Sequence, residues 1–379
     1  MLDDTLLADP GALAELDADG ELRSAATAGA QVRSAAQVAR DVGVGELAGT
    51  RPRALVLLRR PGGSGPAVGL LAALLEPVSP VPVVLASTTP SWVGPLDVVV
   101  AHTADPTDVE LADSVVRAVR RGAEVVLSAP ADGPVASAGA GRVRLVEPRI
   151  PVPPGLDLPR ALAVGLTVVA VLGLLDTPLD PALDQLADQL DAEAERNQPG
   201  HEPFMNPAKS LALRLAEHTP LLWGTDPLGA AVADYAATAL ATHAGVVAYA
   251  ADADRAATAT GLVRMLDREA AGSDVFHDPF DDPPGAEAPP VRLALLATGA
   301  DDPGQVLLRR TGRTWPSADV VHPVEEVARG VPHAGLLRAG LLASRLHMAA
   351  VYLGLATRTL EPAPGIHARS AGAIRDERS

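Results

Sequence analysis

Two kinds of hydrophobic pattern alternate along the 379-residue chain. Apolar positions at helical spacing predict helices of roughly 10 to 15 residues. Between them lie short, continuously apolar runs, which are typical of strands buried inside a parallel sheet. These runs predict strands at residues 54–58, 81–85, 97–101, 124–127, 221–223, 246–250, 291–297 and 319–322. Strands that alternate with helices form βαβ units, so the sequence predicts an α/β fold with parallel sheets.

The chain is long enough for two domains, and a proline-rich segment suggests where they meet. Residues 151–155 read Pro-Val-Pro-Pro-Gly, which favours extended backbone over helix. We expect a first domain over residues 1–150, with about 50 N-terminal residues forming helices that pack on it. A second domain is expected over 151–362, closed by a long apolar helix at 333–360. Residues 278–290 are predicted to be an exposed loop, and 363–379 a disordered tail.

Composition narrows the classes of function. The net charge is -16 and aromatic residues make up 2% of the chain, so it offers neither the basic surface nor the stacking side chains of a nucleic-acid-binding protein. The apolar run at 161–175 is shorter than the roughly 20 residues that span a bilayer, and we expect a buried helix there rather than a membrane anchor. The absence of cysteine and the acidic start, which lacks a signal-peptide pattern, predict a cytoplasmic protein.

Two loops that follow predicted strands could bind an anion. Gly62-Gly63-Ser64-Gly65 lies between a strand and a helix, where glycines let the backbone approach a phosphate and Ser64 offers a hydroxyl. Thr103 and Thr107 follow the third strand, at the edge where open α/β sheets take ligands. Each loop also has a reading without a ligand: the first suits an ordinary turn and the threonines suit helix caps.

Several common site motifs are missing. Gly63, Gly65 and Gly69 do not have the Gly-x-Gly-x-x-Gly spacing of a dinucleotide site, and no Walker or Gly-x-Ser-x-Gly sequence occurs. The histidines show no His-Glu-x-x-His spacing. The sequence therefore predicts no metal site.

The stretch from Asn206 to Gly229 is the most distinctive part of the second half. It contains Lys209, the only lysine, then a buried strand, Gly224 and a new helix at Pro227. Such an arrangement presents backbone amides to an anion at a helix N-terminus.

The order of these pieces resembles the sugar isomerase (SIS) fold, and within it the bifunctional phosphoglucose/phosphomannose isomerases. The resemblance is carried by the two loops above, Pro159-Arg160-Ala161, Asn206-Pro-Ala-Lys209 and Gly224-Thr-Asp-Pro-Leu-Gly229. It implies two αβα domains, a homodimer, no cofactor or metal, and a hexose 6-phosphate ligand. It further implies that Gly63, Ser64, Gly65, Thr103 and Thr107 contact the phosphate, and that Arg160 faces the enediolate of a catalysed reaction.

The catalytic residues of that family are not matched. Its glutamate base should fall near Ala241, a histidine should follow Tyr249 closely, and a second lysine is needed, yet none is present. His243 or Asp234 could replace the base. Two hypotheses stay open: a sugar-phosphate-binding protein of hexose-phosphate metabolism that has lost catalysis, or an isomerase that interconverts fructose 6-phosphate with glucose or mannose 6-phosphate through replaced acid-base residues.

Overall fold

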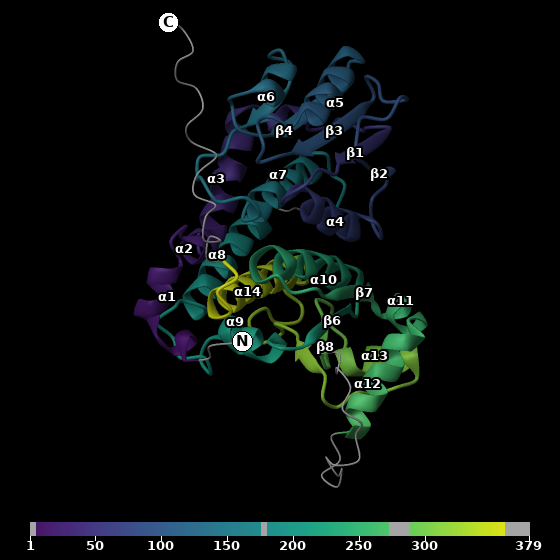
Figure 1. The fold of residues 1–379 in the computed structure, drawn as a ribbon. Helices are drawn as coiled ribbons and strands as arrows, with labels where there is room; N and C mark the ends of the chain where they lie inside the picture. The colour runs from purple at the N-terminus through teal and green to yellow at the C-terminus, as the bar shows by residue number, and fades with distance from the viewer. Residues whose placement is uncertain (1–4, 176–179, 273–288, 361–379) are drawn as a thin grey trace, which may run out of the picture.

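The computed structural model describes residues 5–175, 180–272 and 289–360, and these contain two parallel sheets (Figure 1). The predicted α/β fold with parallel strands and a long C-terminal helix is therefore confirmed. Most of the predicted loop at 278–290, and all of the predicted tail at 363–379, lie outside the described residues.

The first sheet has the strand order β2-β1-β3-β4-β5. Its strands are β1 (Ala54–Leu58), β2 (Val83–Ala86), β3 (Asp97–His102), β4 (Glu124–Ser128) and β5 (Arg144–Val146). Both faces are buried, since Leu55 and Leu57 enter one apolar core while Val56 and Leu58 enter another. The first face is covered by α4 (Ser64–Leu75) and α7 (Leu158–Val171), the second by α5 (Val109–Arg120) and α6 (Pro134–Ala138).

The second sheet has the order β7-β6-β8-β9. Its strands are β6 (Thr219–Gly224), β7 (Tyr249–Asp252), β8 (Val291–Leu296) and β9 (Asp319–Val321). One face packs on α10 (Pro227–Ala239) and α14 (Ala334–Ala356). The other packs on α11 (Ala253–Thr258), α12 (Thr260–Gly272) and α13 (Pro303–Thr311).

One continuous apolar core joins the two sheets. Helices α4, α7, α10 and α14 lie between them and contribute to the same buried cluster (Figure 1). The cluster also includes residues of α8 (Asp180–Arg196) and α9 (Pro207–Leu215). A ligand site on one sheet is thus held by helices that also pack on the other.

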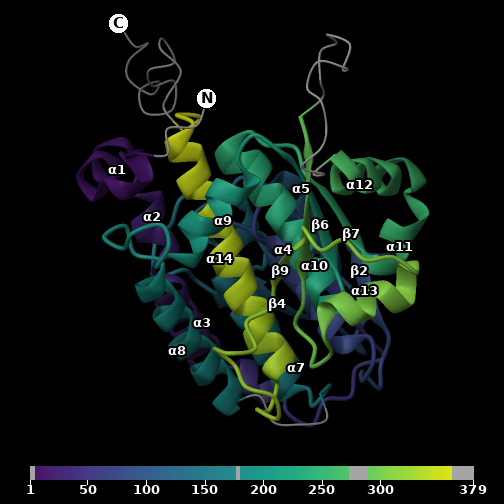
Figure 2. The same ribbon diagram turned by 90° about the horizontal axis from the view of Figure 1, so that it is seen from below.

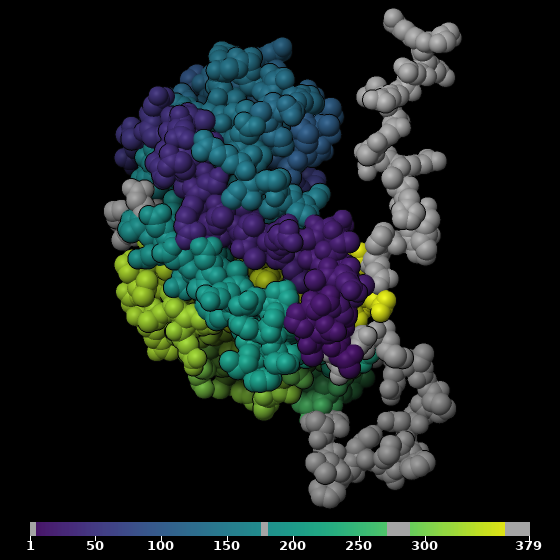
Figure 3. All heavy atoms as spheres, turned by 90° about the vertical axis from the view of Figure 1, so that its left-hand side faces the viewer, coloured from purple at the N-terminus to yellow at the C-terminus, as the bar shows by residue number. Residues whose placement is uncertain are grey.

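The sequence predicted that the N-terminal helices pack on the first domain, but in the structure they also contact the second half. They are α1 (Pro10–Leu16), α2 (Glu21–Ala25) and α3 (Ala28–Asp41). While α3 packs on both α7 and α8, α2 contacts α14. Figure 3 shows this purple segment running across the surface of both halves. The periodicity of apolar residues shows which face of a helix is buried, but it does not show which other helix covers that face.

Helix α14 is long and apolar enough to cross a membrane by length and composition. It nevertheless runs through the middle of the molecule (Figure 2), and 94% of its apolar window is buried there. We therefore interpret it as a core helix, as its packing against α8, α9 and α10 requires.

Candidate functional site

The first sheet reverses its strand order between β1 and β3, because β2 lies on one side of β1 and β3 on the other. Loops that leave such a switch point diverge and open a crevice at the carboxyl ends of the strands. A cavity of about 750 Å³ lies there, which we call the switch-point cavity. Its lining is formed by Arg60, Pro61 and Gly62 after β1, by residues 103–110 after β3, and by Pro154 and Gly155 before α7.

The structure brings together only part of the predicted site. Thr103 and Thr107 line the switch-point cavity. Gly63, Ser64 and Gly65 follow the lining residue Gly62 in the chain, where α4 begins, and do not line the cavity themselves. The sixth predicted residue, Arg160, lies outside this cavity.

The Ser64 side chain points inward. Its hydroxyl donates to the backbone oxygen of Leu58 at 3.1 Å and accepts from the backbone nitrogen of Arg60 at 3.1 Å. Only 1% of the residue is exposed. Because its one proton is used within the turn, Ser64 fixes the connection between β1 and α4 in this conformation.

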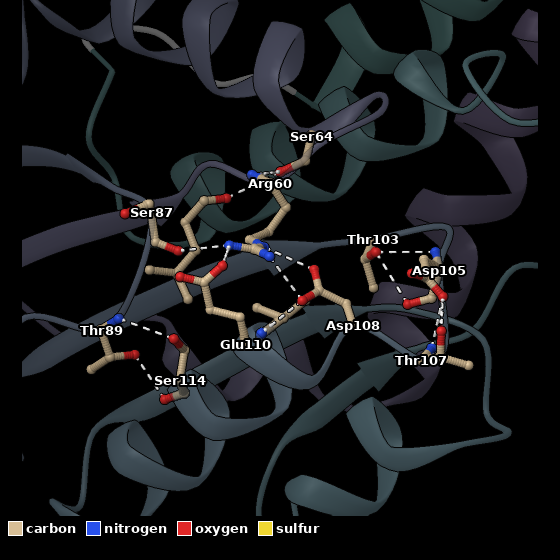
Figure 4. Close-up of polar contacts among 12 residues, drawn as sticks. Arg60, Ser64, Ser87, Thr89, Thr103, Asp105, Thr107, Asp108, Glu110 and Ser114 are labelled. Carbon is tan, nitrogen blue, oxygen red and sulfur yellow. Dashed lines mark hydrogen bonds and ion pairs between the residues drawn. The ribbon is translucent and has the colours of Figure 1, made fainter.

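The loop after β3 is organised by a carboxylate (Figure 4). Asp105 Oδ1 accepts the Thr107 hydroxyl at 2.6 Å and its backbone N–H at 2.8 Å. Thr103 Oγ1 accepts from the backbone nitrogen of Asp105 at 3.0 Å. The hydrogen bonds from Thr107 lower the pKa of Asp105 below its ordinary value, so a negative charge lies where the sequence suggested a phosphate loop.

Among the described residues that line the cavity, Arg60 has the only cationic side chain, and it is already paired. Arg60 donates from Nε and Nη2 to the two carboxylate oxygens of Asp108, each at 2.8 Å, and from Nη1 to Glu110 at 2.7 Å. The bond to Asp108 raises the pKa of Arg60, although burial opposes this shift. Asp108 also accepts from the backbone nitrogen of Leu111 and so caps α5. The cavity therefore contains three carboxylates and one guanidinium.

A buried hydrogen-bonded chain supports the cavity, and sequence reasoning missed it. His102, the last residue of β3, lies 2.6 Å from Asp157 through Nε2 and 2.9 Å from the Ser128 hydroxyl through Nδ1. The other oxygen of Asp157 accepts from the backbone nitrogen of Gly63 at 3.2 Å. Burial is the largest single effect and would raise the pKa of Asp157, but the hydrogen bond with His102 and the nearby charges of His102 and Arg160 together lower it. The sequence contained one sign of this chain: His102 is a polar residue at the end of a strand otherwise made of valines and an alanine after Asp97.

Arg160 borders a separate small cavity of about 10 Å³, together with Gln31, Ser34 and Glu147. Within the described ranges, neither Arg160 Nε nor Gln31 Oε1 has a hydrogen-bond partner. Burial lowers the pKa of Arg160, against the opposing charge of Asp157. A space of this size fits about one water molecule, which could serve both orphan atoms.

The second sheet has its own switch point, between β6 and β8, and a side chain of the protein fills it. Asp226 caps α10 by accepting from Gly229 N at 2.9 Å. It also accepts from the backbone nitrogens of Thr298 at 2.7 Å and Gly299 at 3.0 Å, and from the Thr298 hydroxyl at 2.5 Å. The helix start that the sequence suggested for an anion is thus occupied by this carboxylate.

Lys209 stabilises the surrounding backbone. Its Nζ donates to the carbonyl oxygens of Leu7 at 2.6 Å, Pro199 at 2.8 Å and His201 at 2.8 Å. Burial lowers its pKa. All three of its donors are committed, which leaves none for a ligand.

The two residues considered as replacement bases lie in different settings. Asp234 is exposed on α10, whereas His243 is buried in a π-helical turn at Leu240–Ala244. His243 Nδ1 lies 2.8 Å from Glu21, and its Nε2 lies 3.8 Å from the position a Cβ would take at Gly155, on the cavity wall. Of the two, His243 is placed near the switch-point cavity.

Comparisons with known proteins establish the fold. The sequence matches no protein-family model and no curated protein. Among solved structures, the C-terminal domain of glucosamine-fructose-6-phosphate aminotransferase from Francisella tularensis superimposes with a TM-score of 0.56 at 9% identity, over 89% of this chain and 95% of that one. Tagatose-6-phosphate ketose/aldose isomerase from Escherichia coli gives 0.55 at 10% identity, over 89% and 90%.

A protein from Silicibacter pomeroyi, provisionally named a phosphosugar isomerase, gives a TM-score of 0.58 at 16% identity, over 89% of this chain and 98% of that one. The chain therefore has the two-sheet fold of SIS proteins over most of its length, as its sequence predicted. The narrower resemblance to phosphoglucose/phosphomannose isomerases stays a prediction.

Proposed function

We propose that this protein binds a carbohydrate derivative in the switch-point cavity. The observation that carries the proposal is the cavity's place: it lies between the loops after β1 and β3, where open α/β sheets take their ligands. Its volume of about 750 Å³ is within the usual range of small-molecule sites. The names of the similar structures support a sugar-related ligand, of which the hexose 6-phosphate predicted from the sequence is one candidate.

We also propose that the isomerase chemistry of the phosphoglucose/phosphomannose family is lost. Ala241, at the expected position of the glutamate base, has no ionisable group, and Lys209 is committed to three carbonyls. A general base typically contributes about 10²- to 10⁴-fold in rate. On this view the protein acts by binding, as a cytoplasmic homodimer in carbohydrate metabolism.

An active aldose-ketose isomerase is the second candidate function, and the Glu21–His243 pair favours it. A carboxylate that holds Nδ1 of a histidine leaves Nε2 available as a base. The π-helical turn around His243 is a feature that often occurs at functional sites. Gly155 separates this nitrogen from the cavity, so a ligand would have to approach past that glycine.

Binding can be tested by isothermal titration calorimetry and saturation-transfer NMR with glucose, glucosamine, glucose 6-phosphate and fructose 6-phosphate. Ala104 is exposed and lines the cavity, so the larger side chain of Ala104→Phe should obstruct it and weaken binding. Ala18→Phe, in an exposed turn away from this cavity, is the matched control and should bind normally. Absence of binding by the unmodified protein, or equal binding by Ala104→Phe, would contradict the proposal.

Isomerase activity is measured separately, by NMR of fructose 6-phosphate incubated with the protein. Conversion to glucose or mannose 6-phosphate that disappears in His243→Gln would establish the second candidate. Binding without conversion is the result expected for the first.

A further inference from the structure

Several hydrogen-bond donors around the switch-point cavity are used by the protein's own groups. Gly63 N donates to Asp157, and the Ser64 hydroxyl donates to a backbone carbonyl. Thr107 gives both its backbone N–H and its hydroxyl to Asp105. Gly63, Ser64 and Thr107 are three of the five residues that the sequence suggested for phosphate contact, and each of these donors already has an acceptor within the protein.

The charges of the residues that line the cavity also disfavour a phosphate. Asp105, Asp108 and Glu110 border the cavity, and the single guanidinium, Arg60, is held by two of these carboxylates at 2.7 to 2.8 Å. A phosphate entering the cavity would have to compete with Asp108 and Glu110 for Arg60 and would meet like charge at Asp105. Like charges within a few ångströms disfavour one another.

At the switch point of the second sheet, the described residues leave no open position for an anion. Its switch point holds the Asp226 carboxylate, which accepts four hydrogen bonds from Gly229, Thr298 and Gly299. Each sheet thus has an internal carboxylate near its switch point: Asp157 beside the switch-point cavity of the first sheet, and Asp226 at the switch point of the second.

We propose that the ligand of the switch-point cavity is a carbohydrate without a phosphate group, and that an amine-bearing sugar is preferred. This inference rests on the proposed binding function and names the class of ligand. Sugar hydroxyl and ammonium groups are donors, and carboxylates accept from them in strong, charge-assisted hydrogen bonds. Asp105 and Glu110 are exposed at the cavity, so they are accessible to such donors.

The test compares four probes by calorimetry under one buffer: glucose, glucosamine, glucose 6-phosphate and glucosamine 6-phosphate. We expect glucosamine to bind more tightly than glucose, and each parent sugar to bind about tenfold or more tightly than its 6-phosphate, which is a difference of about 1.4 kcal/mol. Equal or weaker binding of glucosamine than of glucose would contradict the preference for an amine. Tighter binding of either 6-phosphate would overturn the inference while leaving carbohydrate binding intact. Failure of all four probes would overturn the proposed function and this inference together.

A charge-neutralising variant checks the cause. Asp105→Asn keeps an oxygen that can accept from Thr107, so the loop should stay folded, but it removes one negative charge. The preference for glucosamine over glucosamine 6-phosphate should fall several-fold. Asp19→Asn, an exposed aspartate in the turn before α2, is the matched control and should leave the preference unchanged. An unchanged preference in Asp105→Asn would contradict the role assigned to this carboxylate.

Discussion

Asp157 lies 2.6 Å from Nε2 of His102, and both side chains are buried. Asp157 comes from the segment before α7 and His102 from the end of β3, so the bond joins two elements 55 positions apart. Through its second oxygen, Asp157 also holds Gly63 at the start of α4. One carboxylate therefore fixes three of the segments that surround the switch-point cavity.

Replacing Asp157 with asparagine should destabilise the protein. The variant keeps the shape but loses the charge, and its single amide oxygen can accept from His102 or from Gly63 N but not from both. We expect a loss of about 2–3 kcal/mol in the free energy of unfolding, as for other buried charge-assisted bonds. Urea unfolding followed by circular dichroism measures it. Asp188→Asn, at an exposed pair with Arg33, is the control and should unfold almost as the unmodified protein does; equal midpoints for both variants would contradict the role of Asp157.

Stability should also fall in mild acid because of His347. Burial, and then the nearby His243, lower the pKa of His347 to about 3, and Tyr235 is hydrogen-bonded to its Nδ1 at 2.5 Å. The unfolded chain binds a proton near pH 6.5, whereas the folded protein does not until about pH 3. The stability contributed by the neutral ring is thus present above pH 6.5 and is lost as the pH falls.

Between those two pKa values, His347 alone can change the free energy of unfolding by at most about 1.4 kcal/mol per pH unit. Urea midpoints measured between pH 7 and pH 5 should therefore decline, and His347→Gln should show a shallower decline. The same slope in both proteins would show that other groups cause it.

The strands could be predicted from sequence because parallel strands buried on both faces read as unbroken apolar runs. β1, β3 and β8 coincide closely with such runs. β5 was missed: it has three residues, begins with Arg144 and lies at the sheet edge, where polar residues are tolerated and the pattern is weak. Local patterns also could not show that α2 packs on α14, since that contact joins distant segments.

The candidate site was less predictable, because loop position and side-chain direction are different properties. The sequence located the loops after β1 and β3 correctly at one edge of a sheet. It could not show that Ser64 turns inward, or that Arg160 lies beside Gln31 in a separate cavity. Asp157 was overlooked because an aspartate before a helix ordinarily suggests a cap, and its contact with His102 exists only in the folded chain.

Removing the carboxylate of Asp226 should open an anion site in the second half. Asp226→Ala leaves the donors of Gly229, Thr298 and Gly299 without an acceptor, and it removes the cap of α10. We expect a destabilisation of about 1–3 kcal/mol. Sulfate at 50 mM, measured against chloride at equal ionic strength, should raise the melting temperature of the variant more than that of the unmodified protein. Equal shifts would show that the vacated position does not bind anions.

Two glycines at the start of α4 should respond differently to alanine: Gly63 precedes the helix and Gly65 lies in its first turn. A Cβ at Gly63 would lie 2.6 Å from Asp157 Oδ1, closer than atoms can approach, whereas a Cβ at Gly65 would have its nearest neighbour, Arg60 O, at 3.6 Å. Gly63→Ala should therefore displace Asp157 and cost about 1–3 kcal/mol. Gly65→Ala should be neutral or slightly stabilising, since alanine favours a helix by roughly 0.5–1 kcal/mol over glycine.

Urea unfolding of both variants distinguishes the contact from a general effect of altering the turn. If Gly63→Ala loses stability and Gly65→Ala does not, the close approach of Asp157 is the cause. The Gly63→Ala loss should also shrink when Asp157→Ala is introduced beside it, because that change removes the oxygen that the new Cβ would meet. Full additivity of the two changes would show that the glycine and the carboxylate act independently, and that Asp157 does not hold the start of α4.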